Sequence, residues 1–134
     1  MRIGITGSNG FVGGHLASFL RLKENVQLVS FDRSYFEDLG ALEQFVSSCD
    51  VIVHLAGLNR HNDPNEIVKT NIALAEKLVA ACKATGAKPH LLFSSSTQEE
   101  RDNPYGNSKK EARHCFERWA LKVGARFSGL IIPN

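Results

Sequence analysis

The chain has 134 residues, of which 43% are hydrophobic and 22% are charged, and its formal net charge is +2 at pH 7. A chain of this length is expected to form one domain that buries roughly two-thirds of its unfolded surface. Its lysines and arginines are scattered, so the charge pattern excludes no fold but gives no indication of nucleic acid or an anionic membrane as a partner.

Hydropathy and cysteine usage narrow the class of protein further. No apolar stretch approaches the roughly 20 residues of a membrane-spanning helix. The first predicted strand already begins at residue 2, so we predict no signal peptide. Cys49, Cys82 and Cys115 form no C-x-x-C pair, which predicts reduced thiols in a cytoplasmic protein. The histidines share no metal-ligand spacing with one another or with the cysteines, so no metal is predicted.

The predicted elements begin with a strand at residues 2–6 and a glycine-rich loop over residues 7–13. A helix follows, because apolar residues recur at helical spacing in one stripe formed by Phe11, Val12, Leu16, Phe19 and Leu20. The second strand is predicted at residues 26–31. Residues 35–48 are predicted as a short helix or turn.

The third predicted strand, residues 51–55, precedes Asp63-Pro64-Asn65-Glu66. That order is a capping box with proline at the first helical position, and it predicts a helix that ends at Gly86. A fourth strand covers residues 90–94. Asn103-Pro104 predicts a third helix, whose apolar positions are Ala112, Cys115, Phe116, Trp119, Ala120 and Val123. The last strand is predicted at residues 126–132.

Strands and helices alternate along the whole chain, with no linker or internal boundary. Most strand runs are apolar at consecutive positions, which suits parallel strands covered on both faces. The sequence therefore predicts an α/β fold: a doubly wound parallel sheet with helices on both faces and right-handed crossovers.

The first loop carries Gly7, Gly10 and Gly13 at a strand-to-helix junction. Backbone N–H groups and the helix dipole favour an anion there, and glycines let phosphates approach. The spacing indicates a dinucleotide site, although such glycines also suit close helix–sheet packing. Asp32, about twenty residues further on, favours NAD because its carboxylate can bind both ribose hydroxyls. Arg33 can neutralise the 2′-phosphate of NADP, so the choice between NAD(H) and NADP(H) stays open.

Tyr105 and Lys109 lie about 40° apart on one face of the third predicted helix, at its N-terminal turn. The apolar stripe of this helix lies on the same side, so the pair is predicted to point toward the carboxyl edge of the sheet, where ligands bind. An ammonium and a helix N-terminus are expected to lower the pKa of a phenol, which suits proton transfer beside a carbon that exchanges hydride. The serines at 94–96 can bind a substrate oxygen or serve as turn residues.

Together these residues resemble the extended short-chain dehydrogenase/reductase superfamily, often called the NAD-dependent epimerase/dehydratase family. Residues 6–13 resemble its T-G-x-x-G-F-[IV]-G loop, and residues 51–57 resemble its third-strand signature, whose Leu-Ala-Gly turn passes beside the cofactor. The resemblance covers essentially the whole chain and implies a Rossmann-type NAD(P)-binding domain. It places these residues at the cofactor: Gly7, Asn9, Gly10, Phe11, Val12, Gly13, Asp32, Arg33, Leu55, Ala56, Gly57, Ser94 and Lys109.

The same register implies roles for the remaining site residues. Ser96 is the catalytic hydroxyl, Tyr105 the acid/base, and Lys109 the residue that holds the nicotinamide ribose. Asn71 matches the family's structural asparagine. Asn134 lies where the substrate-binding half of the family begins, and it is the implied substrate contact.

Two stretches, residues 54–60 and 94–106, narrow the resemblance, since Tyr105 follows Ser96 by only nine positions. This compact form is most similar to capsular-polysaccharide enzymes that reduce a 4-keto nucleotide sugar, are generally NADPH-dependent, and carry a separate cupin domain. The resemblance implies that residues 1–134 are the cofactor domain of such a reductase, acting in capsular or surface polysaccharide biosynthesis. Most of the sugar pocket and any cupin domain would then be absent from this chain.

Departures from the family pattern define the alternatives. Dehydratases of the family place an Asp-Glu pair directly after the strand-end hydroxyl, whereas this chain has Thr97-Gln98. A reductase or an epimerase is therefore expected before a dehydratase. Ile131 stands where relatives often show arginine. A nucleotide-sugar 4-epimerase and a non-catalytic dinucleotide-binding module remain alternatives, a homodimer stays open, and the isolated chain is expected to bind cofactor without turnover.

Overall fold

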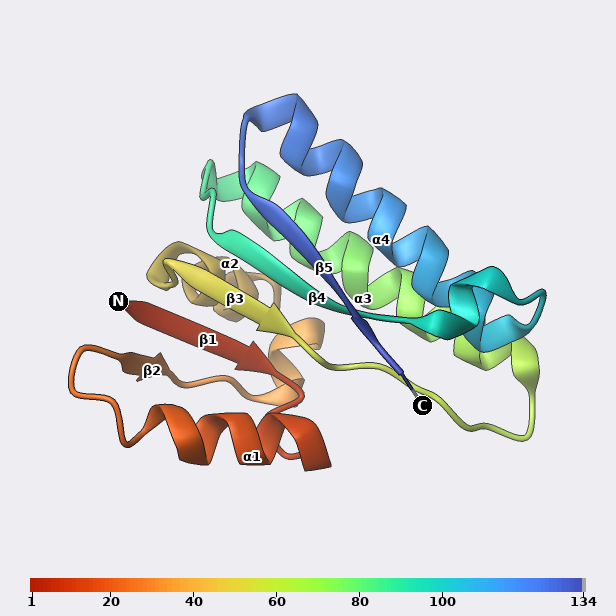
Figure 1. The fold of residues 1–134 in the computed structure, drawn as a ribbon. Coiled ribbons are helices and arrows are strands. Elements are labelled where there is room, and N and C mark those ends of the chain that lie inside the picture. Colours follow the sequence, from red (N-terminus) through yellow and green to blue (C-terminus); the bar gives the residue numbers. More distant parts are fainter. Residues whose placement is uncertain (134) are drawn as a thin grey trace.

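The fold is a five-stranded parallel sheet with helices on both faces, seen in a computed structural model that describes residues 1–133 (Figure 1). Its order across the sheet is β2-β1-β3-β4-β5. All neighbouring strands pair in parallel, so their carboxyl ends meet at one edge. The strands are β1 (Arg2–Thr6), β2 (Gln27–Val29), β3 (Val51–His54), β4 (His90–Ser96) and β5 (Phe127–Ile132).

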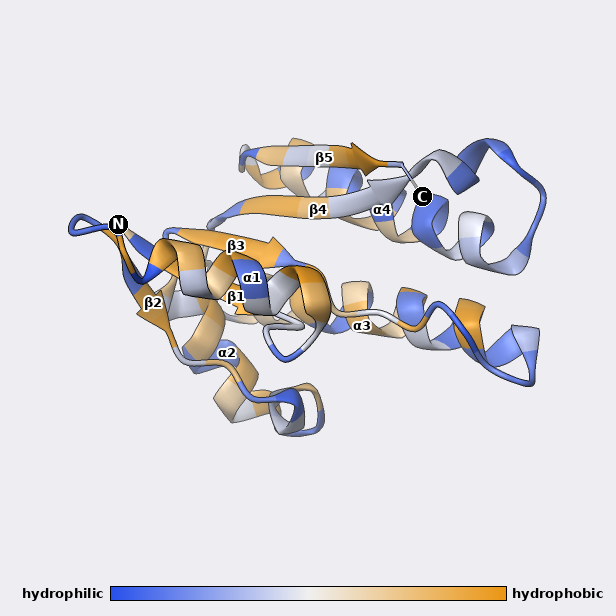
Figure 2. Ribbon diagram, turned by 60° about the horizontal axis from the view of Figure 1, so that its bottom comes forward, coloured by the Kyte–Doolittle hydropathy of each residue, from blue (hydrophilic) through white to orange (hydrophobic). Residues whose placement is uncertain are grey.

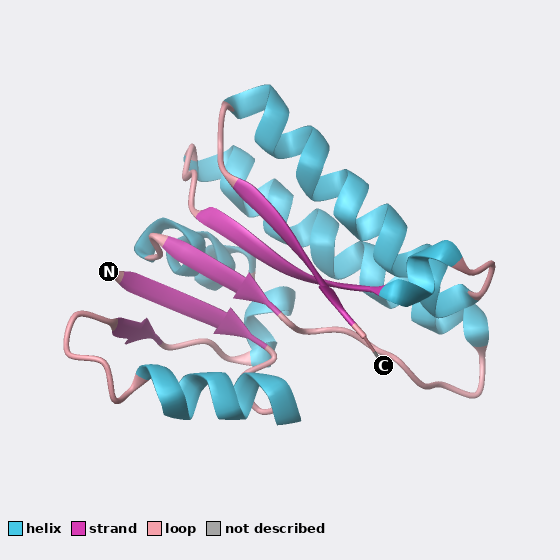
Figure 3. Ribbon diagram, viewed as in Figure 1, coloured by secondary structure: helices cyan, strands magenta, loops and turns pink. Residues whose placement is uncertain are grey.

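Helices connect successive strands, as the alternation of cyan and magenta in Figure 3 shows. One of them, α1 (Phe11–Leu20), lies on one face of the sheet, and α2 (Leu39–Ser48), α3 (Pro64–Thr85) and α4 (Pro104–Val123) lie on the other (Figure 1). The strand order explains this division, because right-handed crossovers running in opposite directions across a sheet lie on opposite faces. The doubly wound prediction is confirmed. Within residues 1–133, no helix is both long and apolar enough to cross a membrane.

Several predicted boundaries shift. Strand β2 keeps only three of the six predicted residues, since the chain turns at Asp32 into the short 3-10 helix η1 (Arg33–Glu37). Strand β4 instead continues through Ser96, because Ser96 still pairs with Ile132 of β5. The segment predicted as a short helix or turn becomes η1 followed by the ten-residue α2.

The helix caps follow the sequence with one correction. Asn103 is the N-cap of α4, and its Oδ1 accepts a 2.7 Å bond from the Gly106 N–H. Helix α3 begins after Asp63 and ends at Gly86, which has a φ of 73°. The reciprocal capping box predicted here does not form: the Asp63 N–H donates to His61 Nδ1 at 2.9 Å. In a capping box the Glu66 carboxylate would accept the bond from the Asp63 N–H, and here His61 Nδ1 accepts it instead.

Only part of the predicted stripe of α1 docks on the sheet: Leu16 and Leu20 pack against the smaller core cluster. Phe11 is 82% exposed, and Val12 and Phe19 are also exposed, whereas the buried positions of α1 are Gly13 and Ala17. A Cβ on Gly13 would overlap the Gly7 carbonyl oxygen. Gly13 therefore allows the helix backbone to approach the loop after β1, and Ala17 packs beside Leu16 and Leu20.

The larger hydrophobic core lies between the sheet and the face formed by α2, α3 and α4. It includes Phe45, Ile52, Leu78, Phe116 and Trp119, so the prediction that Trp119 is a core residue is confirmed. A smaller cluster under α1 holds Ile3, Ile5, Ala17 and Val53. In Figure 2, β4 changes from orange to near white toward its carboxyl end, where the apolar strand runs into its three serines.

The Thr6 hydroxyl joins the ends of β1 and β3. Its Oγ1 accepts bonds from the Leu55 and Ala56 N–H groups, both at 3.2 Å, and lies 2.7 Å from His54 Nδ1. An oxygen that accepts two N–H bonds still has its own proton to donate to the imidazole. A Cβ on Gly7 would lie 2.8 Å from the Ala56 nitrogen. The loops after β1 and β3 are thus packed directly against each other at the carboxyl edge.

Two glycines of α1 provide a matched test of this packing. We expect Gly13→Ala to lower the free energy of unfolding by about 1–3 kcal/mol, because the added methyl overlaps the Gly7 carbonyl. Gly14→Ala, whose Cβ would meet the Ser8 oxygen at 3.5 Å, is expected to stabilise by about 0.5–1 kcal/mol through helix propensity. Urea unfolding of both variants measures the difference. Equal stabilities would show that the close approach at Gly13 does not matter.

His54 makes stability depend on pH. The ring is 2% exposed, and burial, with a smaller contribution from Lys109, lowers the His54 pKa from 6.5 to about 3. The unfolded chain therefore binds this proton first as pH falls below 6.5, and the folded state loses stability until about pH 3. Between pH 7 and pH 5 we expect a loss of about 2 kcal/mol from this group. Unfolding of His54→Gln at the two pH values should lack that loss; an unchanged pH dependence contradicts the assignment.

Candidate active site

A cleft of about 320 Å³ lies at the carboxyl edge of the sheet. Its walls are the loop after β1, the turn after β3, the end of β4 and the first turn of α4. Eleven of the residues predicted for the site line this cleft: Gly7, Gly10, Phe11, Val12, Gly13, Leu55, Gly57, Ser94, Ser96, Tyr105 and Lys109. Residues nearly 100 positions apart in the sequence thus meet in one place.

Other predicted residues lie elsewhere. Asn9, Asp32, Arg33 and Ala56 are not in the cleft lining, and Asn134 lies outside the described residues. Three lining residues were not predicted: Asn59, Ser95 and Ile132. The position of Asn59 just after the Leu-Ala-Gly turn and that of Ile132 at the end of a strand were signals that could have identified them.

The glycine loop leaves the N-terminus of α1 open toward the cleft. Gly7 has a φ of 77°, a left-handed conformation that favours glycine, and its carbonyl accepts the Gly10 N–H at 3.0 Å. Gly10 is the N-cap of α1 and offers no side chain to the first N–H groups. Within residues 1–133, every other helix, including the 3-10 turns, has a side-chain cap. The first turn of α1 therefore keeps donors and positive dipole for an external anion.

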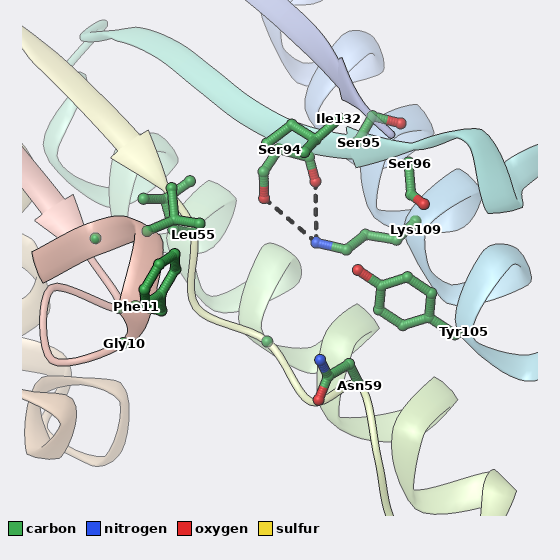
Figure 4. A pocket seen from close by; sticks show the side chains of 14 residues that line it. Gly10, Phe11, Leu55, Asn59, Ser94, Ser95, Ser96, Tyr105, Lys109 and Ile132 are labelled. Carbon is green, nitrogen blue, oxygen red and sulfur yellow. Dashed lines mark hydrogen bonds between the residues drawn. The ribbon is translucent and has the colours of Figure 1, made fainter. Parts of the chain in front are cut away.

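Lys109 is 6% exposed, and its ammonium is held against the end of β4. Nζ donates to the Ser94 carbonyl at 2.9 Å and lies 3.4 Å from the Ser94 hydroxyl (Figure 4). It also sits 4.9 Å from the centre of the Phe93 ring. Burial lowers the Lys109 pKa to about 8, and the negative charge of Glu99 opposes that change. The ammonium is thus a partly desolvated donor at the floor of the cleft.

Tyr105 is half-buried, and its hydroxyl points into the cleft on the side of the Lys109 ammonium (Figure 4). The predicted geometry of the pair is therefore present. The predicted direction of the pKa change is wrong, because burial raises the Tyr105 pKa. The Lys109 ammonium lies 5.7 Å from the ring centre and bonds to Ser94 instead. Desolvation outweighs the distant charge, so the phenol keeps its proton at neutral pH.

The three serines at the end of β4 have different partners. Ser94 contacts Lys109, and the Ser96 hydroxyl extends toward Tyr105 while it accepts the Gln98 N–H at 3.1 Å (Figure 4). Ser95 also lines the cleft, but its hydroxyl points away from Lys109 and Tyr105 and, buried, has no hydrogen-bond partner among the described residues. Alternation along a strand explains the division, since Ser94 and Ser96 share one face.

The segment between Ser96 and Tyr105 is fixed on α4. Its 3-10 turn η2 (Thr97–Glu100) packs so closely that a Cβ on Gly106 would overlap the Gln98 carbonyl. Gln98 Oε1 accepts from Asn103 Nδ2 at 2.9 Å, and Glu99 forms an ion pair with Arg113 at 2.9 Å. The short connection therefore holds the Ser96 and Tyr105 side chains at one side of the cleft.

Asp32 and Arg33 lie beyond β2, outside the cleft lining. Asp32 is exposed and caps η1 by accepting the Ser34 N–H at 2.9 Å. That hydrogen bond lowers the Asp32 pKa. Arg33 is exposed and forms no salt bridge within residues 1–133. The Asp32 carboxylate thus already accepts one hydrogen bond, while the Arg33 guanidinium is accessible to a ligand.

These features fit a dinucleotide. An uncapped helix N-terminus beside glycines suits a pyrophosphate, and a buried ammonium beside strand-end oxygens suits ribose hydroxyls. The residues available to hold it are Gly7, Gly10 and Gly13 for the phosphates and Lys109 for the nicotinamide ribose.

Comparisons with known proteins agree with this geometry. The chain is 35% identical over 134 residues to a UDP-2-acetamido-2,6-beta-L-arabino-hexul-4-ose reductase of Pseudomonas aeruginosa, and it spans 36% of that protein's length. The structure of RMD from Pseudomonas aeruginosa complexed with NADPH has a TM-score of 0.87 at 25% identity, covering 100% of this chain and 55% of that one.

The capsular polysaccharide assembling protein CapF of Staphylococcus aureus is similar as well. Its structure has a TM-score of 0.76 at 30% identity, covering 100% of this chain and 36% of that one. The NAD dependent epimerase/dehydratase family model matches residues 3–134. Since this match spans nearly the whole chain and the fold agrees with it, the chain belongs to the NAD dependent epimerase/dehydratase family.

Proposed function

We propose that this chain is the cofactor-binding part of an NADP(H)-dependent oxidoreductase that reduces a 4-keto nucleotide sugar. The observation that carries the proposal is the convergence of Ser96, Tyr105 and Lys109 on the cleft at the open N-terminus of α1. The 35% identical relative is a reductase of a UDP-linked hexul-4-ose. Because the chain spans 36% of that relative, the activity of the whole protein is inferred.

The proton step follows from the environment of Tyr105. When bound, the nicotinamide cofactor supplies the hydride for the reduction. Tyr105, whose raised pKa keeps it protonated at neutral pH, donates its phenolic proton to the carbonyl oxygen. The Lys109 ammonium stabilises the phenolate that remains. Ser96, on the same side of the cleft, orients the carbonyl because its hydroxyl donates a hydrogen bond to the same oxygen.

Burial raises the Tyr105 pKa, so the phenol is protonated at neutral pH and is available as the general acid that a reduction needs. The chain lacks the acidic residue that a dehydration would need. Gln98 occupies a position where a dehydratase of the family would place an acidic residue, and here its amide accepts a bond from Asn103. An amide cannot exchange the protons that dehydration requires, so we do not propose a dehydratase.

The wider setting is inferred from relatives that are longer than this chain. We infer that residues 1–134 are a cofactor domain, with the sugar pocket completed by further chain. The likeness to CapF, a capsular polysaccharide assembling protein, supports a role in capsular or surface polysaccharide biosynthesis. Three cysteines without a disulfide support a cytoplasmic location. A homodimer is compatible with this assignment.

Arg33 and Asp32 bear on the choice of cofactor. Asp32 Oδ1 accepts a hydrogen bond from the Ser34 N–H, so this oxygen is less available to accept hydrogen bonds from the ribose hydroxyls. Arg33 is exposed at the start of η1, close in sequence to the carboxyl end of β2, where an adenosine 2′-phosphate would bind. This arrangement favours NADP(H) over NAD(H).

Tyr105→Phe tests the proton-transfer role in the full-length protein. We expect turnover of a 4-keto nucleotide sugar to fall about 10²–10⁴-fold, because a positioned general acid contributes that much. Calorimetry should give an NADPH Kd within about twofold of the original. Tyr35→Phe is the matched control, since Tyr35 lies in η1 outside the cleft and its variant should retain turnover. Undiminished turnover in Tyr105→Phe rules out the assigned role.

Arg33→Ala tests the cofactor preference. We expect NADPH to bind more tightly than NADH, and the variant to lose about tenfold in NADPH affinity with little change for NADH, because a charge-assisted hydrogen bond to phosphate is lost. Parallel calorimetric titrations with NAD, NADH, NADP and NADPH measure this. Tighter binding of NADH by the original protein would assign the site to NAD(H). Stoichiometric NAD already bound after purification would favour the epimerase alternative.

A further inference from the structure

Ser108 lies in the first turns of α4, between the two cleft residues Tyr105 and Lys109. Its side chain is completely buried, with 0% exposure. The hydroxyl donates to the Tyr105 carbonyl at 2.8 Å and accepts a bond from Asn71 Nδ2 at 2.9 Å. One buried hydroxyl is therefore bonded both to its own helix and to α3.

Asn71 extends this connection to the loop after β3. Its Oδ1 accepts the Leu58 N–H at 2.7 Å, and its Nδ2 donates to the Leu58 carbonyl at 2.9 Å. The side-chain amide thus binds both backbone groups of one loop residue. The chain of hydrogen bonds runs from Leu58 through Asn71 and Ser108 to the Tyr105 backbone, and we call it the Ser108 brace.

The brace spans two walls of the cleft. Leu58 directly follows Gly57 and precedes Asn59, both of which line the cleft from the β3 side. A Cβ on Gly57 would lie 3.2 Å from Asn71 Oδ1 and 3.9 Å from Lys109 Nζ. The loop at Gly57 therefore lies close to both the brace and the ammonium, and it is packed more tightly against Asn71.

Lys109 connects the same helix to the opposite wall of the cleft. While Ser108 connects α4 to the loop after β3, the next residue connects α4 to the end of β4 through Ser94. Neighbouring residues of one helical turn thereby set the distance from Tyr105 to both facing walls. A buried hydroxyl with two partners is costly to remove, because its partners lose bonds that water cannot replace.

We propose that Ser108 is a positioning residue of this site, which holds the loop carrying Gly57 and Asn59 at a fixed distance from the Tyr105–Lys109 turn. The use of this geometry for cofactor and keto sugar rests on the proposed function. Removal of the hydroxyl leaves Asn71 with one partner fewer, so the loop gains freedom and the dinucleotide meets a less ordered cleft.

Amide hydrogen exchange followed by NMR tests the brace without relying on activity. The Leu58 N–H has a side-chain acceptor on α3, so its exchange reports on the brace directly. In Ser108→Ala we expect Leu58 exchange to accelerate about tenfold relative to the amides of β1 and β3, because one anchoring hydrogen bond is lost. NADPH affinity measured by calorimetry should fall severalfold.

Thr85→Val is the matched control. The Thr85 hydroxyl also donates to a carbonyl of its own helix, that of Ala81 at 2.9 Å, and accepts an N–H, that of Ala87 at 3.2 Å, but it lies at the far end of α3. Its loss should lower the melting temperature and leave both Leu58 exchange and NADPH affinity unchanged. Equal Leu58 acceleration in the two variants would mean general destabilisation and would overturn the proposal.

Amide exchange in the unsubstituted protein provides a further test that needs no variant. If Leu58 exchanges as fast as the exposed residues Asn59 and Arg60 that follow it, the brace does not hold the loop and the proposal is overturned, even if Ser108→Ala fails to fold. If Leu58 exchange responds as expected but no protein variant binds any nicotinamide dinucleotide, the brace stands and the proposed function fails.

Discussion

The site depends on a buried ammonium held at the end of a β-strand. Burying the Lys109 charge costs free energy, and its bonds to Ser94 and the adjacent Phe93 ring offset part of that cost. These contacts are available only if α4 lies across the end of β4 with its first turn inward. The position of Tyr105, one turn earlier, follows from the same docking.

The chemistry assigned to Tyr105 changes in consequence. A lysine close to a tyrosine is commonly expected to favour the phenolate, yet here Lys109 is occupied by Ser94, and burial raises the Tyr105 pKa. A protonated phenol is a proton donor.

Small polar side chains hold the walls of the cleft. Thr6 bonds the turn after β3 to the end of β1, Asn71 and Ser108 bond the next residues of that loop to α4, and Asn103 bonds Gln98 in the segment after β4. Thr6 and Asn71 bond backbone groups that have no strand partner, and the Asn103 amide fixes the Gln98 side chain, so irregular segments at the carboxyl edge stay ordered. In contrast, the N-terminus of α1 is left without a side-chain cap. The edge is thus rigid where it must orient groups and open where an anion can bind.

The sequence by itself determined the strand and helix alternation, the caps at Asp63 and Asn103, the helix ends at glycine, and the meeting of the glycine loop with Tyr105 and Lys109. These depend on local backbone chemistry and on the rule that parallel strands share one carboxyl edge. Only the tertiary structure decided which residues of the α1 stripe are buried, which two of the three serine hydroxyls face the cleft, and in which direction the Tyr105 pKa moves. Those outcomes depend on desolvation and on contacts between residues far apart in the chain, which no local pattern encodes.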